Sequence, residues 1–141
     1  MDRKEINTQA KHVGNVCELV ALSKMVKLGW SVSIPFGDNC RYDVVIDKKD
    51  GKLIRGQIKS ACRPKEKNGE VVSIPLETRN KEGYNKYTEQ EVDAFIAVDL
   101  IDDSVYYIPY EAVKDQRVCK LRLVGGKYNT HETKWAKDFL L

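Results

Sequence analysis

No run of apolar residues in this 141-residue chain approaches the roughly 18–20 that a helix needs to cross a bilayer, which excludes a helical membrane protein. The charged start, Met1–Glu5, is not followed by an uninterrupted apolar core, so a secretory signal peptide is not expected. Internal repeats, low-complexity tracts and linkers are also absent. The length suits one compact domain over residues 1–141, which we expect to be cytoplasmic.

Cysteine is scarce and dispersed. No two of the four cysteines form the C-x-x-C pair typical of a zinc site, and a chain of this length does not need disulfides to stabilise its core. We therefore expect ordinary reduced thiols at Cys17, Cys40, Cys62 and Cys119.

Positive charge is in slight excess, with a formal net charge of +3, but it is unevenly distributed along the chain. The net charge is 0 over residues 1–47, +6 over 48–86, −7 over 87–115 and +4 over 116–141. A basic middle beside an acidic block suits a polyanion on one surface. Folding can also interleave the blocks so that they neutralise each other, and the pattern alone leaves both interpretations open.

Residues 8–28 are predicted to form the one long helix, because apolar residues recur there at spacings of three and four. Asn7 or Thr8 is available as its N-cap, and Gly29 ends it. The apolar stripe of this helix consists of Val13, Cys17, Val20, Ala21, Met25 and Leu28.

From Trp30 onward the apolar period shortens to two, or to short apolar runs, which is typical of strands. The predicted strands cover residues 30–35, 42–47, 52–60, 71–76, 95–100 and 105–108. The polar stretch 77–90 has no clear apolar period and is expected to be a loop or a short helix. One helix feeding a series of strands predicts a mixed α/β sheet.

The predicted strand 52–60 carries the sharpest chemical signal. Strand alternation places Leu53, Arg55, Gln57 and Lys59 on one face. The Cα atoms of Gln57 and Lys59 would lie about 6.6 Å apart. At that separation an amide oxygen can bind a metal while the ammonium contacts the same water or phosphate.

Asp43 leads into the apolar run 44–46 of the preceding strand. If the two strands pair antiparallel, Asp43 falls near Gln57 and Lys59. The alternatives are a turn residue for Asp43 and a solvated or edge residue for Lys59.

Glu18 lies beside the apolar stripe of the predicted helix, in one row with Gly14, Ala21 and Met25. A glycine in the middle of a helix costs about 1 kcal/mol relative to alanine. The cost of Gly14 therefore predicts a role for it, such as allowing the close approach of another backbone or of a ligand. The alternative is that Glu18 is a flanking carboxylate and that Gly14 has no special role.

Several separated motifs follow one another in a characteristic order. They are Gly14-x-x-x-Glu18, Leu28-Gly29-Trp30, Pro35-Phe36-Gly37-Asp38, Arg41-Tyr42-Asp43 and Gln57-Ile58-Lys59-Ser60-Ala61. In this order and spacing the chain resembles the PD-(D/E)XK nuclease superfamily, and within it the small group I intron-encoded homing endonucleases with a Q-x-K third motif. The resemblance implies a restriction-endonuclease-like mixed β-sheet with an N-terminal helix, an α-β-β-β-α-β core.

The resemblance also implies a Mg²⁺-dependent endodeoxyribonuclease, with Mn²⁺ as a substitute metal. Glu18, Asp43, Gln57 and Lys59 would be its catalytic residues. Asp43, Gln57, Glu18 and the backbone carbonyl of Ile58 would bind the metal, and Lys59 would polarise the attacking water or contact the phosphate. Because Gln57 replaces the usual acid, the site carries one negative charge fewer than the superfamily pattern, which weakens the binding of a hard cation.

Double-stranded DNA is the partner that the resemblance implies. Phosphate contacts are expected from seven basic side chains, Arg41, Arg55, Arg63, Lys65, Arg79, Lys81 and Lys86. Tyr84 and Tyr87 would either stack on bases or pack on the sheet. Cutting both strands calls for a symmetric assembly, so a homo-oligomer, a dimer or tetramer, is expected. The apolar tail 118–141 would form its interface unless it packs in the core.

Three functions stay open at this point. The first is site-specific, homing-type double-strand cleavage. The second is a junction-resolving or repair nuclease of the same superfamily, which would prefer branched DNA. The third is a catalytically silent DNA-binding module, in which Gln57 marks a decayed site.

Overall fold

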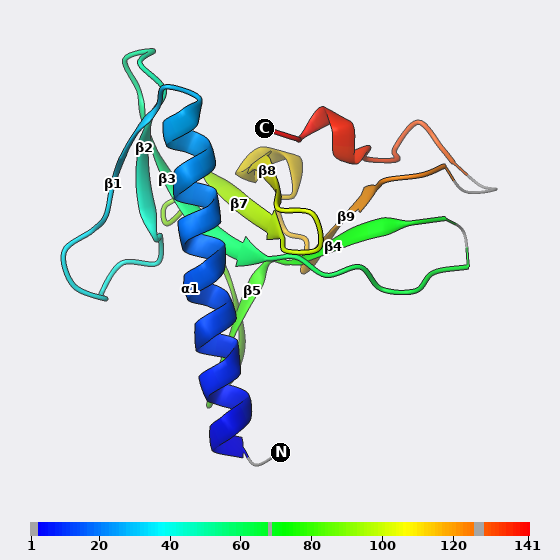
Figure 1. Ribbon diagram of the computed structural model, residues 1–141, viewed down its shortest axis with the longest axis horizontal. Helices are drawn as coiled ribbons and strands as arrows, with labels where there is room; N and C mark the ends of the chain where they lie inside the picture. Colours follow the sequence, from blue (N-terminus) through cyan, green and yellow to red (C-terminus); the bar gives the residue numbers. More distant parts are fainter. Residues whose placement is uncertain (1–2, 68, 126–128) are drawn as a thin grey trace.

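The computed structural model describes residues 3–67, 69–125 and 129–141. Within these ranges a long helix, α1 (Arg3–Lys27), is followed by nine strands. Figure 1 shows how the helix and the strands are arranged. The strands are β1 (Ser31–Ser33), β2 (Val44–Asp47), β3 (Leu53–Ser60), β4 (Val71–Pro75), β5 (Glu77–Asn80), β6 (Gly83–Lys86), β7 (Ala94–Asp99), β8 (Ser104–Pro109) and β9 (Val118–Arg122). Two short 3-10 helices, Tyr110–Ala112 and Ala136–Asp138, complete the chain. The predicted mixed sheet with an N-terminal helix is confirmed.

The main sheet has five strands in the order β1-β2-β3-β7-β8. All neighbours are antiparallel except β3 and β7, which run parallel. The interior strand β7 is buried along its whole length, which is typical of a strand covered on both faces. The other two sheets have two strands each, β4-β9 and β5-β6.

Helix α1 covers one face of the main sheet (Figure 1). Its contact row is Cys17, Ala21 and Met25, all buried against apolar side chains of β2, β3, β7 and β8. The predicted stripe is too long, because Val13 and Leu28 are 38% and 44% exposed. Val13 belongs to the exposed stretch 9–15 of the helix, and Leu28 lies in the turn that follows the last helical residue, Lys27.

The start of α1 differs from the prediction. The helix begins at Arg3, so Asn7 and Thr8 lie inside it and neither is its N-cap. Its C-terminal end agrees with the prediction, since Gly29 has a φ of +88° that favours glycine. Residues 9–15 are exposed all round, so the first half of the helix extends beyond the sheet (Figure 1).

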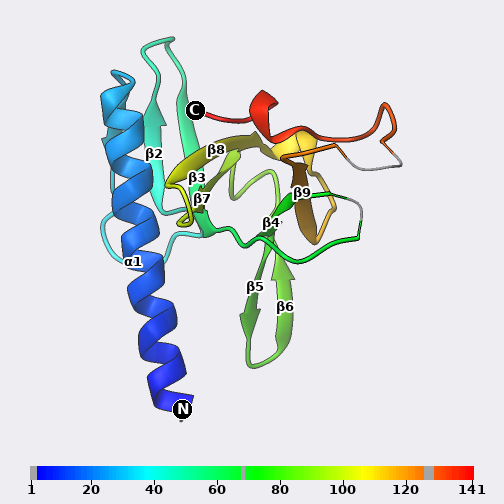
Figure 2. The ribbon, with the colours of Figure 1, turned by 45° about the vertical axis from the view of Figure 1, so that its right-hand side comes forward.

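The opposite face of the main sheet is covered by the small β4-β9 sheet and the C-terminal segment, which give the molecule a third layer (Figure 2). Buried side chains of β4, β7, β8 and β9 form this second core cluster. Phe139 packs against the second cluster and Leu141 against the helix-side cluster, so core packing accounts for these parts of the tail.

The connection between the parallel strands β3 and β7 is where the fold departs from the implied α-β-β-β-α-β order. Parallel neighbours need a long crossover, which is usually a helix. Here the described part of the crossover contains β4, β5 and β6, and no α-helix. The polar stretch predicted as a loop or short helix is instead the β5-β6 hairpin.

All four cysteines are free thiols, two of them buried (Cys17 and Cys119). Among the residues described, none of the helices has the length and apolar character of a membrane span.

Candidate active site

Asp43 lies where strand β2 begins, against the middle of β3. Its backbone N–H donates to the carbonyl of Gly56 at 2.9 Å, and the N–H of Ile58 donates to its Oδ2 at 3.0 Å. Strands β2 and β3 pair antiparallel, with Val44 opposite Gly56, which is the condition under which Asp43 falls near Gln57 and Lys59. Asp43 is thus held against the strand that carries Gln57 and Lys59.

The carbonyl of Ile58 faces the same edge of β3 as Asp43. In a strand the N–H and C=O of one residue point to the same side, and the N–H of Ile58 points to Asp43. The ladder with β2 begins at the pair Val44 and Gly56, so Ile58 lies beyond its end. A backbone oxygen is therefore available next to the carboxylate.

Lys59 lies on the other face of β3 from the helix-side core. Its half-buried Nζ donates to the carbonyl of Glu77 at 3.2 Å and lies 4.8 Å from the ring centroid of Tyr87. Burial lowers the pKa of Lys59, the negative charge of Asp43 acts against this, and the positive charge of Arg41 adds to it. The lysine thus loses its proton more readily than an exposed one.

Asp43 interacts electrostatically with groups on both faces of the sheet. Burial raises the pKa of Asp43, against the opposing effects of the Ile58 N–H and of Lys59. Burial also raises the pKa of Glu18 on α1, and the negative charge of Asp43 raises it further. Glu18, Asp43 and Lys59 therefore form one charge cluster, with Glu18 coming from the helix and Lys59 from the opposite face of β3.

Gln57 lies between these residues in sequence and is half-buried. It shares the face of β3 that carries Lys59, as the alternation predicted, since Gly56 and Ile58 are buried on the other face. Its side-chain amide has no hydrogen-bond partner within the described ranges. A neutral oxygen is thus free to bind a ligand there.

The groups predicted to bind a metal would all offer oxygen atoms: two carboxylates, one amide and one backbone carbonyl. Within the described ranges, no group of three or more His, Cys, Asp or Glu side chains could hold a metal ion. A site with two carboxylates and neutral oxygens still suits Mg²⁺, which prefers hard oxygen ligands and keeps several of its waters. The raised pKa values of Glu18 and Asp43 support this fit, because a cation between the two carboxylates would relieve the cost of ionising both.

Tyr87 and Arg41 form the wall next to Lys59. Tyr87 is only 5% exposed and packs edge-on against Phe95, so packing, rather than base stacking, describes its position. Arg41 lies over the Tyr87 ring with its guanidinium carbon 4.2 Å from the centroid, and donates to Oγ1 of Thr78 at 3.0 Å. The interaction of Tyr87 with both cations was not predicted, because nothing local in the sequence relates it to position 41 or 59.

Three of the basic residues expected on DNA have carboxylate partners within the chain, and the first of them, Arg41, lies 3.3 Å from Oε2 of Glu91. Arg55 contacts both carboxylate oxygens of Asp93 at 2.9 and 3.0 Å, and the carbonyls of Glu89 and Gln90. The acidic residue Asp93 therefore braces the segment before β7.

Arg63 is held in the same way by two carboxylates. It contacts Asp99, which is 1% exposed, at 2.6 Å and Asp102 at 2.8 Å. The ion pair ties the chain after β3 to the end of β7, so part of the positive charge in the basic segment is neutralised by the acidic block.

The other predicted contacts are more accessible. Lys65, Arg79, Lys81 and Lys86 are exposed. Among them, Lys86 donates to the carbonyl of Asp115 at 3.2 Å.

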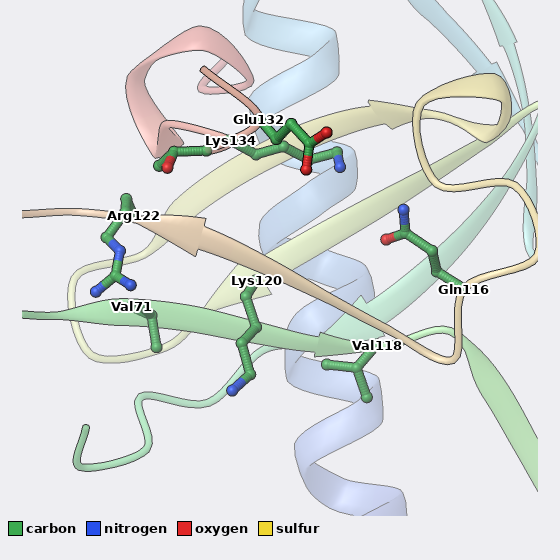
Figure 3. Close-up of a pocket in the computed structure, with 8 residues that line it drawn as sticks. Val71, Gln116, Val118, Lys120, Arg122, Glu132 and Lys134 are labelled. Carbon is green, nitrogen blue, oxygen red and sulfur yellow. The ribbon is translucent and has the colours of Figure 1, made fainter. Parts of the chain in front are cut away.

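A pocket of about 350 Å³ lies elsewhere, between the β4-β9 sheet and the C-terminal segment (Figure 3). Basic side chains line it, with Glu132 as the acidic member. Glu18, Asp43, Gln57 and Lys59 take no part in its lining. The charge cluster around Asp43 is therefore separate from this pocket.

The family model of the PD-(D/E)XK endonucleases matches residues 8–141. The chain belongs to the PD-(D/E)XK endonuclease family. A solved structure of a bacterial homing endonuclease, I-Ssp6803I, is similar in fold, with a TM-score of 0.65 and 22% sequence identity over 92% of this chain and 85% of that one. A search of curated proteins finds no match. The resemblance stated from the motifs is thus confirmed.

Proposed function

We propose that this PD-(D/E)XK endonuclease is a Mg²⁺-dependent enzyme that hydrolyses phosphodiester bonds in double-stranded DNA by site-specific, homing-type cleavage. The single observation that carries the proposal is the cluster around Asp43. This carboxylate interacts with Glu18 from the helix and Lys59 from the sheet, and accepts the N–H of Ile58. Membership of the family supports nuclease activity, and the homing endonuclease with the similar fold supports this mode of cleavage.

Four oxygen donors would hold the metal: Asp43, Glu18, the amide of Gln57 and the carbonyl of Ile58. A bound divalent ion supplies charge stabilisation to the phosphate oxygens and lowers the pKa of a water. The Ile58 N–H holds Oδ2 of Asp43, so its other oxygen, Oδ1, keeps a fixed direction.

Lys59 orients the attacking water or contacts the scissile phosphate through Nζ. Its pKa is lowered by burial, so that the ammonium donates a proton more readily than an exposed lysine would. Glu77 and Tyr87 hold Nζ in position, with a carbonyl 3.2 Å away and a ring centroid 4.8 Å away. The lysine thus does not depend on DNA to reach its place.

Phosphate contacts in the proposal come from the exposed cations Lys65, Arg79, Lys81 and Lys86, with Arg41 beside the site. Such contacts position the duplex and carry little sequence information. Arg55 and Arg63, which are paired with carboxylates, act mainly as braces of the segments around them. Cleavage of both strands by one site per chain requires two sites related by symmetry, so we include a homo-oligomer, a dimer or tetramer, in the proposal.

Incubation of supercoiled and linear plasmid DNA with the wild-type protein and three variants, in Mg²⁺, Mn²⁺ or EDTA, tests this function. We expect discrete cleavage in either metal, none in EDTA, and loss of cleavage by at least about a hundredfold in Lys59→Ala and Asp43→Ala. Lys52→Ala is the matched control, because Lys52 is an exposed lysine just before β3. Full activity in Lys59→Ala or Asp43→Ala would contradict the assignment.

The neutral side chain of Gln57 is the one observation that favours a second candidate, a silent DNA-binding module. Tight DNA binding without cleavage in any divalent metal would select that function. A strong preference for branched over linear substrates would instead select a junction-resolving or repair nuclease.

A further inference from the structure

The β5-β6 hairpin projects away from the body of the protein (Figure 2). It is anchored at both ends by core residues, since Leu76 and Tyr87 are 2% and 5% exposed. Between them the strands Glu77–Asn80 and Gly83–Lys86 pair only with each other. A two-stranded ribbon of this kind has the dimensions that the major groove of DNA admits.

One face of the hairpin is packed against the body at its base. Cross-strand pairing and alternation put Glu77, Arg79, Tyr84 and Lys86 together on this face. Arg117 contacts Oε1 of Glu77 at 2.6 Å and lies over the ring of Tyr84 at 5.3 Å. Contacts within the protein thus occupy much of this face.

The other face carries Thr78, Asn80 and Asn85 and is turned toward Arg41, two residues before Asp43. Oγ1 of Thr78 accepts a hydrogen bond from Arg41 at 3.0 Å, and Oδ1 of Asn80 accepts the N–H of Glu82 within the turn. The exposed side-chain amide of Asn85, directly opposite Thr78, has no hydrogen-bond partner in the described part of the chain. The hairpin therefore presents one free amide on the side of the catalytic cluster.

We propose that the β5-β6 hairpin lies in the major groove of the target and that Asn85 reads an adenine there. The inference rests on the proposed nuclease function and adds a specificity-determining residue to it. A side-chain amide matches the N7 acceptor and N6 donor of adenine, and no other base presents that pair in the major groove.

The shape and the charge of the hairpin and its surroundings both favour a DNA duplex as the binding partner. The exposed first half of α1 and the hairpin project in the same direction, as both views show (Figures 1 and 2). Glu18 lies on α1, and Lys59 on β3 donates to the carbonyl of Glu77, the first residue of the hairpin. The hairpin carries three cations, Arg79, Lys81 and Lys86, against two acids, the exposed Glu82 of the turn and Glu77, which is paired with Arg117. Asn85 would then contact a base edge while the lysines of the hairpin contact phosphates.

The hairpin is also connected to the catalytic lysine. The carbonyl of Glu77, its first residue, accepts from Nζ of Lys59, and the side chain of Thr78 accepts from Arg41. The hairpin that would carry the base contact therefore also supplies hydrogen-bond partners to Lys59 and Arg41 beside Asp43.

Selection of cleaved molecules from a randomised duplex library, with the wild type, Asn85→Ala and Lys81→Ala, tests the proposal. We expect the wild-type site to contain a position with a strong adenine preference, and Asn85→Ala to lose a discrimination of roughly 5- to 150-fold at that position alone. Lys81→Ala, the control at the exposed hairpin turn, should weaken binding to all sequences and reduce its salt dependence. Replacing the selected adenine by 7-deazaadenine should slow the wild type and leave Asn85→Ala unchanged.

The outcomes separate this inference from the proposed function. Cleavage by Asn85→Ala with the wild-type preference at every position, or wild-type cleavage without sequence preference, would overturn the role of Asn85 and leave the nuclease intact. No cleavage or binding of any DNA by the wild type would overturn both. Thermal unfolding serves as the fold control, since Asn85 is exposed and unbonded and its replacement should not shift the melting temperature.

Discussion

The backbone N–H of Ile58 donates a hydrogen bond of 3.0 Å to Oδ2 of Asp43. This contact fixes a carboxylate from the start of β2 against the strand that carries Gln57 and Lys59. It also keeps the pKa of Asp43 lower than burial alone would, although the net shift is upward. Ionised Asp43 is therefore held in place at a cost to the stability of the fold, which is typical of a functional site.

Replacement of Asp43 by asparagine should stabilise the metal-free protein at neutral pH. Because the folded-state pKa of Asp43 is raised, its favourable contribution is fully present only below the ordinary value of 3.8 and is lost as the pH rises through the raised value. Asp43→Asn should therefore unfold at a higher temperature than the wild type at pH 7 in EDTA. This difference should vanish as the pH falls through the raised pKa.

The effect of Mg²⁺ on the melting temperature gives a second comparison of the wild type and Asp43→Asn. The ion should raise the melting temperature of the wild type and leave that of Asp43→Asn unchanged, because the variant lacks the charge that binds it. An equal Mg²⁺ shift in both proteins would place the ion elsewhere.

Gln57→Glu should retain cleavage with an altered metal preference. The substitution restores the acid of the superfamily pattern next to Asp43, so we expect roughly tenfold tighter Mg²⁺ binding. A calorimetric titration of the wild type and the variant measures this, with Gln57→Ala as the control that removes the oxygen. Identical titrations for all three proteins would show that position 57 does not touch the metal.

Gly14→Ala should separate stability from function. A Cβ at this exposed helical position would meet no described atom within 4 Å, so packing against another backbone does not explain the glycine. The helix should gain about 1 kcal/mol from the alanine. If a DNA backbone approaches the helix one turn before Glu18, the same variant should bind and cleave DNA less well.

The control for Gly14 is Asn15→Ala, an exposed neighbour on a different side of the helix. Chemical denaturation and DNA-binding titrations give the two quantities. A stabilised Gly14→Ala with unaltered binding would leave no ligand role for the glycine.

Arg55→Ala should act on stability, whereas Lys65→Ala should act on DNA affinity. Arg55→Ala removes charged hydrogen bonds to Asp93 that are partly screened by solvent. We expect this to lower the free energy of unfolding by about 1–2 kcal/mol. Lys65 is exposed, so its removal should leave the free energy of unfolding unchanged and lower the salt slope of DNA binding by about one. If Arg55→Ala weakened DNA binding and Lys65→Ala lowered the free energy of unfolding, the two roles would be the reverse of those proposed.

Much of the site could be predicted because its signals are local. Alternation in β3 places Gln57 and Lys59 on one face whatever the rest of the chain does. Helical spacing in α1 identified the row Cys17, Ala21 and Met25 that packs on the sheet. The hairpin was missed, although Asn80 and Gly83 flank a turn of a common type, because polar strands exposed on both faces carry no hydrophobic alternation.

The sequence by itself determined the N-terminal helix and six of the strands (β1, β2, β3, β4, β7 and β8). It also determined the identity of the acid, the amide and the lysine, and the excess of cations between residues 48 and 86. Only the tertiary structure decided which of those cations stay available for contacts with DNA phosphates. Arg55 and Arg63 meet carboxylates 38 and 36 residues away, because the parallel pairing of β3 with β7 brings the basic and acidic segments together. The pairing of strands far apart in the sequence depends on the packing of the whole sheet, so local periodicity does not predict it.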